Sequence, residues 1–249
     1  MNNCGVIYVA VDPETSPSPF KFNSGKKSIL RDVLNSINSL KKSNPDLNVT
    51  VFSDFNKELF CESSADKIIP IKNDFGFIPK VFGIKNSPYE KTIFLDCDTY
   101  IAQNISDLFD QLESFDFCVG TEFLDKEILN TGVLAFNKNN DILVNFLELW
   151  LDQMLSTKAK VISEQKKFSN KTPDDQGCFN GILRMQHKNP DGKPYFIKNM
   201  INIARSLHWN ILDNKIWNCR NTQYKHLLES DWDFNQTKIF HMRSFSGHE

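Results

Sequence analysis

Residues 91–100 read K-T-I-F-L-D-C-D-T-Y, a short apolar run followed at once by two aspartates. An apolar run of this length, bounded by turn signals, is typical of a buried strand. If the chain stays extended beyond Leu95, the side chains of Asp96 and Asp98 point to the same side. Open α/β sheets bind ligands at the carboxyl ends of their strands. We therefore expect these two carboxylates to lie at the ligand edge of a central strand.

Two carboxylates held this close repel each other, so they need a bound cation or a shared proton. A divalent cation held by carboxylates in turn indicates a substrate that carries phosphate groups. The simpler explanation is a strand that ends in two solvated acids. His241 follows the apolar pair at 239–240 and would complete a metal site if its strand lies beside the Asp96 strand. Manganese accepts an imidazole beside oxygen ligands. Without that pairing, His241 is a core or surface histidine.

The segments before this strand predict a doubly wound sheet. Apolar runs at 5–11, 47–52 and 68–71 are typical of buried strands, and residues 26–40 carry apolar side chains at helical spacing. Strands alternating with helices predict an α/β fold with a Rossmann-like, mostly parallel central sheet flanked by helices. The later predictions are strands at 116–121, 130–136 and 239–240, helices at 75–86, 106–112, 139–155 and 174–186, and a solvated loop at 158–171.

Composition excludes several classes of protein. Lys and Arg number 29 against 31 Asp and Glu, a balance that argues against a nucleic-acid partner. None of the 6 cysteines forms a C-x-x-C pair and several sit in apolar runs, so we expect buried free thiols and a reducing compartment. The N-terminus lacks a basic region, and acids interrupt the apolar stretch at 142–155, which excludes a transmembrane segment there. We predict a soluble, cytoplasmic protein with one domain over residues 1–249.

Three further motifs have simple structural explanations beside functional ones. Asp174 and Asp175 stand where a helix begins, and acids there cap the helix and are favoured by its dipole. Capping explains the acids but not the Gln176-Gly177 that follows. Residues 130–132, N-T-G, suit a turn in which glycine accepts a positive φ. Lys80 is expected on a helix, where a lysine is usually solvated.

Taken in order, these motifs resemble those of the family 8 glycosyltransferases, the group of glycogenin and of bacterial lipopolysaccharide galactosyltransferases. The resemblance covers most of the chain. It rests on the first strand at 6–12, Lys80 in I-P-K-V-F, the D-x-D block at 89–100, the N-T-G-V block at 130–136, Asp175-Gln176-Gly177, and the closing 239–241.

The resemblance implies a GT-A fold, in which residues 1–100 form the nucleotide-binding half and 101–249 the donor-sugar and acceptor half. It also implies a hexosyltransferase that uses manganese, with magnesium as the alternative, and a nucleotide-sugar donor, usually a UDP-sugar. The acceptor would be a saccharide, a glycoconjugate or a protein, and transfer would retain the anomeric configuration.

The resemblance also assigns roles by position. The implied roles are Asp96, Asp98 and His241 as metal ligands, Asp96 also near the ribose, Val11 and Asp12 near the base, Lys80 at the diphosphate, Asn130 and Gly132 around the donor sugar, and Asp175 and Gln176 at its reacting carbon. Either Asp175 forms a covalent intermediate, or the acceptor attacks on the same face with a phosphate oxygen as base. The family continues after the histidine with a glycine and then Lys-Pro-Trp, whereas this chain has Ser244 and Gly247. Arg243 is the candidate that replaces the missing lysine.

Two other functions remain open at the level of sequence. Haloacid-dehalogenase-type phosphohydrolases also place D-x-D after an apolar strand, with a later acid pair for which Asp174 and Asp175 are candidates. In those enzymes the motif usually follows the first strand, whereas three predicted strands precede Asp96 and Asp98 here. The missing lysine also makes a non-catalytic nucleotide-sugar binding protein an alternative.

Overall fold

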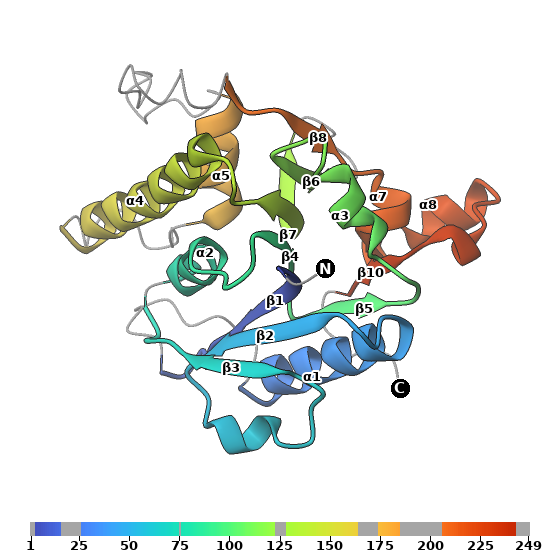
Figure 1. The fold of residues 1–249 in the computed structure, drawn as a ribbon, viewed down its shortest axis with the longest axis horizontal. Helices are drawn as coiled ribbons and strands as arrows, with labels where there is room; N and C mark the ends of the chain where they lie inside the picture. Colours follow the sequence, from blue (N-terminus) through green and yellow to red (C-terminus); the bar gives the residue numbers. More distant parts are fainter. Residues whose placement is uncertain are drawn as a thin grey trace.

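The computed structural model describes residues 3–15, 26–74, 76–122, 128–163, 174–184 and 206–242. Its centre is a seven-stranded sheet of order β3-β2-β1-β4-β7-β6-β8 (Figure 1). The strands are β1 (Cys4–Ala10), β2 (Asn48–Ser53), β3 (Lys67–Pro70), β4 (Lys91–Leu95), β6 (Phe117–Thr121), β7 (Leu129–Asn137) and β8 (Trp209–Ile211). Neighbouring strands are parallel except where β7 meets β4 and β6. The predicted mostly parallel α/β sheet is confirmed.

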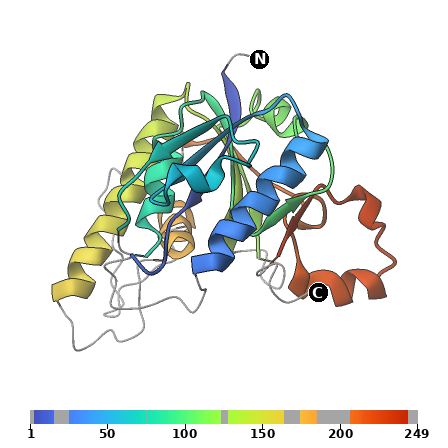
Figure 2. The ribbon, with the colours of Figure 1, turned by 90° about the horizontal axis from the view of Figure 1, so that it is seen from below.

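Helices cover both faces of this sheet. The flanking helices are α1 (Lys26–Ser43), α2 (Ile78–Lys85), α3 (Asp107–Gln111), α4 (Asp141–Ser163) and α5 (Asp175–Arg184). Successive residues of a strand point to opposite faces, so Val6 and Tyr8 of β1 pack in the core beside α1, and Ile7 packs in the core beside α2 and α4. Figure 2 shows α1 and α4 on opposite sides of the sheet. Burial on both faces explains why the strands are continuous apolar runs.

A second, three-stranded sheet returns the end of the described chain to the middle of the molecule. Its strands are β5 (Thr99–Ile101), β9 (Cys219–Arg220) and β10 (Ile239–His241), in the order β5-β10-β9. Short elements lead to it: α7 (Asn214–Trp217), α8 (Tyr224–Glu229) and single 3-10 turns at Lys57–Phe60, Asn221–Gln223 and Phe234–Gln236. Because β5 starts at Thr99, pairing with it places His241 next to the D-C-D segment.

Several expectations of local structure differ from what is observed. Residues 130–132 belong to strand β7 rather than to a turn, and Gly132 is not among the described residues with positive φ. The strand of His241 does not lie beside the Asp96 strand, which was the stated condition for a shared site, because β1 and β7 already flank β4 on both sides. It pairs with β5 and β9 instead. The predicted loop at 158–171 is helical through Ser163, while 164–171 lie outside the described residues. Residues 156–163 contain no proline or glycine to end α4, and Lys158 forms an ion pair with Asp74.

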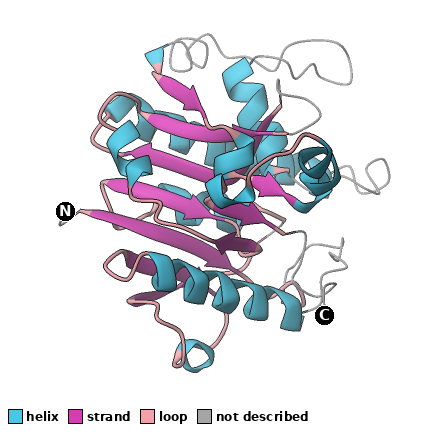
Figure 3. Ribbon diagram, turned by 90° about the vertical axis from the view of Figure 1, so that its right-hand side faces the viewer, coloured by secondary structure: helices cyan, strands magenta, loops and turns pink. Residues whose placement is uncertain are grey.

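The reversed strand β7 decides where the functional side chains meet. Strands β1, β2 and β4 are parallel, so their carboxyl ends lie at one edge of the sheet, and β7 begins at that same edge because it runs antiparallel to β4. Figure 3 shows the strands of the sheet side by side, with helices on both of its faces. The Asp96 amide N–H donates to the Gly132 carbonyl over 2.8 Å. Residues 130–132 are thereby held directly beside the D-C-D segment. Among the described helices, none has the length and apolar content needed to cross a membrane.

Candidate functional site

The two aspartates converge through a turn rather than through an extended strand. Strand β4 ends at Leu95, and the Thr99 amide N–H and Oγ1 both donate to the Asp96 carbonyl, over 3.3 and 2.8 Å. The predicted extended path from Asp96 to Asp98 is therefore wrong, although both side chains do end at the edge of the central strand. Cys97 lies between them, and its thiol donates to the Val9 carbonyl over 3.2 Å. The turn is thereby attached to β1 on its inner side.

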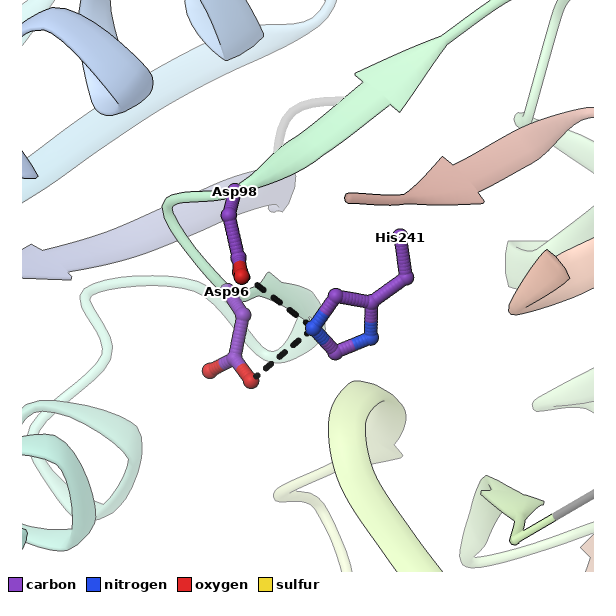
Figure 4. Close-up of side chains that lie close together, drawn as sticks. All are labelled: Asp96, Asp98 and His241. Atoms are coloured by element: carbon purple, nitrogen blue, oxygen red, sulfur yellow. Dashed lines mark ion pairs between the residues drawn. The ribbon is translucent and has the colours of Figure 1, made fainter. Parts of the chain in front are cut away.

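His241 completes a three-residue cluster with these aspartates (Figure 4). Its Nε2 lies 3.2 Å from Asp98 Oδ1 and 3.7 Å from Asp96 Oδ2. One ligand atom from each residue lies within 4.8 Å of the others. Burial lowers the pKa of His241, but the hydrogen bond and charge of Asp98, with the charge of Asp96, outweigh it and raise that pKa above its ordinary value. The cluster thus favours a positive charge at this point.

Gly132 leaves the space that the cluster occupies. A Cβ built at this position would lie 2.3 Å from His241 Cε1 and 2.9 Å from Asp96 Oδ2. Any side chain here would displace either the imidazole or the carboxylate. Close approach of side chains to the backbone is therefore the physical reason for a glycine at this position.

Lys80 on α2 joins the D-C-D turn to the start of α5. Its ammonium lies 2.9 Å from Asp96 Oδ1 and 2.8 Å from Asp175 Oδ2, and it donates to Thr131 Oγ1 over 3.3 Å. Burial lowers the pKa of Lys80, but the two carboxylates outweigh this effect and raise it above its ordinary value. Lys80 is thus a charged and mostly buried bridge, and not the solvated lysine that helix position alone suggests.

At the beginning of α5, Asp174 caps the helix, while one acid and one amide, Asp175 and Gln176, face the site. Asp174 Oδ2 accepts the Gly177 amide N–H over 3.0 Å, which is the predicted cap. Asp175 is buried, and Thr131 Oγ1 donates to its Oδ2 over 2.7 Å. Gln176 donates through Nε2 to Glu122 Oε1 over 3.1 Å. Asp175 and Gln176 therefore lie on the side of α5 that faces β7 and the end of β6.

Glu122 is a site residue that sequence reasoning missed. Its Oε1 accepts from Asn130 Nδ2 over 2.7 Å as well as from Gln176, and its Oε2 pairs with Arg220. Burial raises the pKa of Glu122, but these hydrogen bonds and the Arg220 charge outweigh it and lower the pKa below its ordinary value. An acid directly after the buried strand β6 repeats the pattern of Asp96, and that signal could have found it. Asn218, a buried residue that contacts His241 Nδ1 over 2.8 Å, follows no such pattern.

The residues predicted near a base follow the strand beside β4. Val11 and Asp12 follow β1, the strand next to β4, so they lie at the same edge of the sheet. The Asp12 amide donates to Asp54 Oδ1 over 2.7 Å, and its carbonyl accepts from Asn73 Nδ2 over 2.6 Å. The structure brings Lys80, Asp96, Asp98, Asn130, Gly132, Asp175, Gln176 and His241 into one region. Arg243 lies outside the described residues.

The sheet order, its one reversed strand and the D-x-D turn define the GT-A fold, and similar solved structures have the same fold. No family model matches the chain, and no curated protein matches it in sequence. The structure is similar to the glycosyltransferase GlyE of Streptococcus pneumoniae, with a TM-score of 0.57 and 16% identity over 96% of this chain and 54% of that one. The chain therefore spans about half the length of GlyE.

Two further similar structures are matched over more of their own length. One is the galactosyltransferase LgtC in complex with donor and acceptor sugar analogues, with a TM-score of 0.54 and 13% identity over 96% of this chain and 87% of that one. The other is mouse xyloside xylosyltransferase 1, with a TM-score of 0.52 and 14% identity over 95% and 96% of the two chains. At these identities the likeness establishes the fold.

Proposed function

We propose that this chain is a metal-dependent, retaining glycosyltransferase. It would move a hexose from a nucleotide-sugar, a UDP-sugar, to a saccharide, glycoconjugate or protein acceptor. The observation that carries the proposal is the cluster of two carboxylates and an imidazole, within 4.8 Å, at the carboxyl end of the central strand. The GT-A fold and the glycosyltransferases that share it support this function.

The residues of the cluster fit a divalent cation. Two carboxylate oxygens suit Mn²⁺ or Mg²⁺, and the imidazole of His241 favours Mn²⁺. Burial, with repulsion from Asp98 and Asp175, raises the pKa of Asp96 in spite of Lys80 and His241, so a bound cation would stabilise its ionised form. Gly132 leaves room beside the ligands. The bound ion would neutralise the charge of a nucleoside diphosphate leaving group.

The chain's own residues would then orient and stabilise the donor. Lys80 already holds Asp96 and Asp175 in place and adds a point charge beside the phosphates. The reacting carbon becomes oxocarbenium-like, as in glycoside cleavage. Because Gln176 gives its Nε2 to Glu122, its carbonyl oxygen points away from Glu122. We assign that oxygen to the face of the reacting carbon.

Asp175 would act on the donor through charge. It is buried, and its Oδ2 already accepts from Lys80 and Thr131, so attack on the same face of the sugar suits it better than a covalent intermediate. The nucleotide would lie over residues 1–100, near Val11 and Asp12. The donor sugar and the acceptor would lie over residues 101–249, with Asn130 and Gly132 around the sugar.

Hydrolysis of UDP-sugars with and without Mn²⁺ tests this function. Asp98→Asn should abolish the Mn²⁺-dependent reaction, while Asp110→Asn on the exposed face of α3 should leave it unchanged. Full activity in Asp98→Asn would contradict the metal assignment. Thermal shifts with UDP- and GDP-sugars would identify the donor through stabilisation of the native state.

The same assays separate the alternatives. A non-catalytic binding protein would show the thermal shift with UDP-sugar and Mn²⁺ but neither hydrolysis nor transfer. A phosphohydrolase would release phosphate from a simple phosphoester such as p-nitrophenyl phosphate and would show no shift with nucleotide-sugars. Either result would replace the glycosyltransferase proposal.

A further inference from the structure

A continuous chain of hydrogen bonds connects Glu122 to His241. Glu122 Oε1 accepts from Asn130 Nδ2 over 2.7 Å, and Asn130 Oδ1 accepts from Asn218 Nδ2 over 2.9 Å. Asn218 Oδ1 then lies 2.8 Å from His241 Nδ1. The chain crosses from the end of β6 to the start of β7, to the residue after α7, and to β10. Asn218 has no exposed surface, so the chain is shielded from water at this link.

The direction of the donors in this chain is determined by the Glu122 carboxylate and by the Gly132 backbone N–H. An ionised carboxylate can only accept, so Asn130 must present its NH₂ group to Glu122 and its oxygen to the other side. That oxygen also accepts the Gly132 backbone N–H over 3.0 Å, and a backbone donor cannot be reversed. Asn218 must therefore give its NH₂ group to Asn130 and its oxygen to His241.

The ends of the chain are held by further contacts. Arg220 pairs with Glu122, and Gln176 donates to the same carboxylate. Both contacts lower the pKa of Glu122, so its carboxylate stays ionised and can only accept hydrogen bonds. At the other end, the Nε2 of His241 faces Asp96 and Asp98. An acceptor at Nδ1 keeps a proton on Nδ1, so Nε2 is the nitrogen that would lose its proton and offer a lone pair to a cation.

We propose that Asn218 is a positioning residue that keeps the proton of His241 on Nδ1 and so presents Nε2 to a divalent cation. Glu122 is the residue that sets the direction of the chain through Asn130. The inference rests on the proposed metal site. Histidine ligands of metals usually donate their other ring N–H to an acceptor, and removal of such an acceptor typically costs 10–100-fold in metal affinity. The chain also connects a metal ligand to residues expected around the donor sugar.

Mn²⁺ affinity of the full chain, without donor or acceptor, tests the role of Asn218. The probe is the EPR signal of free Mn²⁺. Asn218→Leu should weaken binding by about 10–100-fold, and Asn218→Asp, which still accepts from Nδ1–H, should stay within about threefold of wild type. Asn214→Leu is the matched control, because Asn214 is also a buried amide but bonds Thr121 instead. It should lower stability and leave Mn²⁺ affinity unchanged.

The outcomes separate this inference from the function on which it rests. Wild-type affinity in Asn218→Leu, or equal losses in the Leu and Asp variants, would overturn the role of Asn218. Absence of Mn²⁺ binding by the wild-type chain would instead refute the proposed metal-dependent function.

A measurement on the wild-type protein remains decisive if Asn218→Leu fails to fold. NMR of the ¹⁵N-histidine-labelled, metal-free chain should show a slowly exchanging proton on His241 Nδ1, assigned by its loss in His241→Ala. An unprotonated Nδ1, or a proton that exchanges as fast as those of exposed His226, would overturn the inference.

Discussion

Replacing Lys80 with methionine removes a buried ammonium and keeps a side chain of similar length. Lys80 Nζ lies within 2.9 Å of carboxylates of both Asp96 and Asp175, and the Lys80 and Asp175 side chains are only 11% and 6% exposed. Removal of one partner of a buried pair leaves an uncompensated charge, which costs about 3–5 kcal/mol. For a chain of this length we expect Tm to fall by about 6–20 °C. Thermal and urea denaturation of the metal-free protein at pH 7 measure the loss.

Lys85→Met is the matched control on the same helix. Lys85 pairs with Glu148 over 3.2 Å, but these side chains are 30% and 51% exposed, so the pair contributes at most about 1 kcal/mol. The expected fall in Tm is then no more than about 4 °C. Equal losses in Lys80→Met and Lys85→Met would refute the argument that burial makes the first ion pair important.

The double variant Lys80→Met/Asp175→Asn tests the cause of the loss. Asparagine removes the carboxylate charge that Lys80→Met leaves unpaired, and it still offers an oxygen to Thr131. We therefore expect the double variant to be more stable than the sum of the two single losses predicts. Strictly additive losses would mean that Lys80 and Asp175 do not stabilise each other.

Three further perturbations probe the surroundings of the cluster. Gly132→Ala should cost about 1–3 kcal/mol through overpacking and weaken Mn²⁺ binding in calorimetric titration, and unchanged affinity would contradict the close approach of His241. Because the pKa of His241 is raised, its pairing with Asp98 stabilises the metal-free protein fully below pH 6.5 and is lost as pH rises through that pKa. The difference in the free energy of unfolding between wild type and His241→Gln should then narrow with rising pH in urea denaturation. A difference that widens would contradict the upward shift of the His241 pKa. Trp150→Phe removes the indole donor to the Asp175 carbonyl, and urea denaturation should detect a loss of about 1–3 kcal/mol; a neutral result would contradict that bond.

Sequence patterns were most informative where structure is local. Strands β1, β2 and β4 are buried on both faces, so each left a continuous apolar run that could be recognised. The helix α1 left a periodic apolar face for the same reason. The sequence does not indicate that β7 runs antiparallel to β4, because N-T-G-V-L-A-F is equally suited to either direction of pairing. The predicted end of α4 was too early, because the polar, lysine-containing stretch at 156–163 is compatible with a solvated helix as well as with a loop.

The same distinction between local and long-range structure holds for the candidate site. The side chains of Asp96 and Asp98 follow an apolar strand, and the order of motifs led to Lys80 and His241 as well. Their geometry could not be predicted, because it depends on a turn after Leu95 and on pairing between strands that are far apart in sequence. Asn218 could not be found at all, since its partner Asn130 is 88 positions away.

Two bridges connect the candidate metal site to the proposed donor-sugar region. Lys80 couples Asp96 to Asp175 directly, through a buried ammonium shared by two carboxylates. The amides of Asn130 and Asn218 couple His241 to Glu122, and Glu122 in turn holds Gln176. A movement of the D-C-D turn would have to break the first bridge, and a rotation of the His241 ring would have to break the second. Because both bridges end on the first two residues of α5, the position of the metal and the position of the reacting carbon should be set together rather than independently.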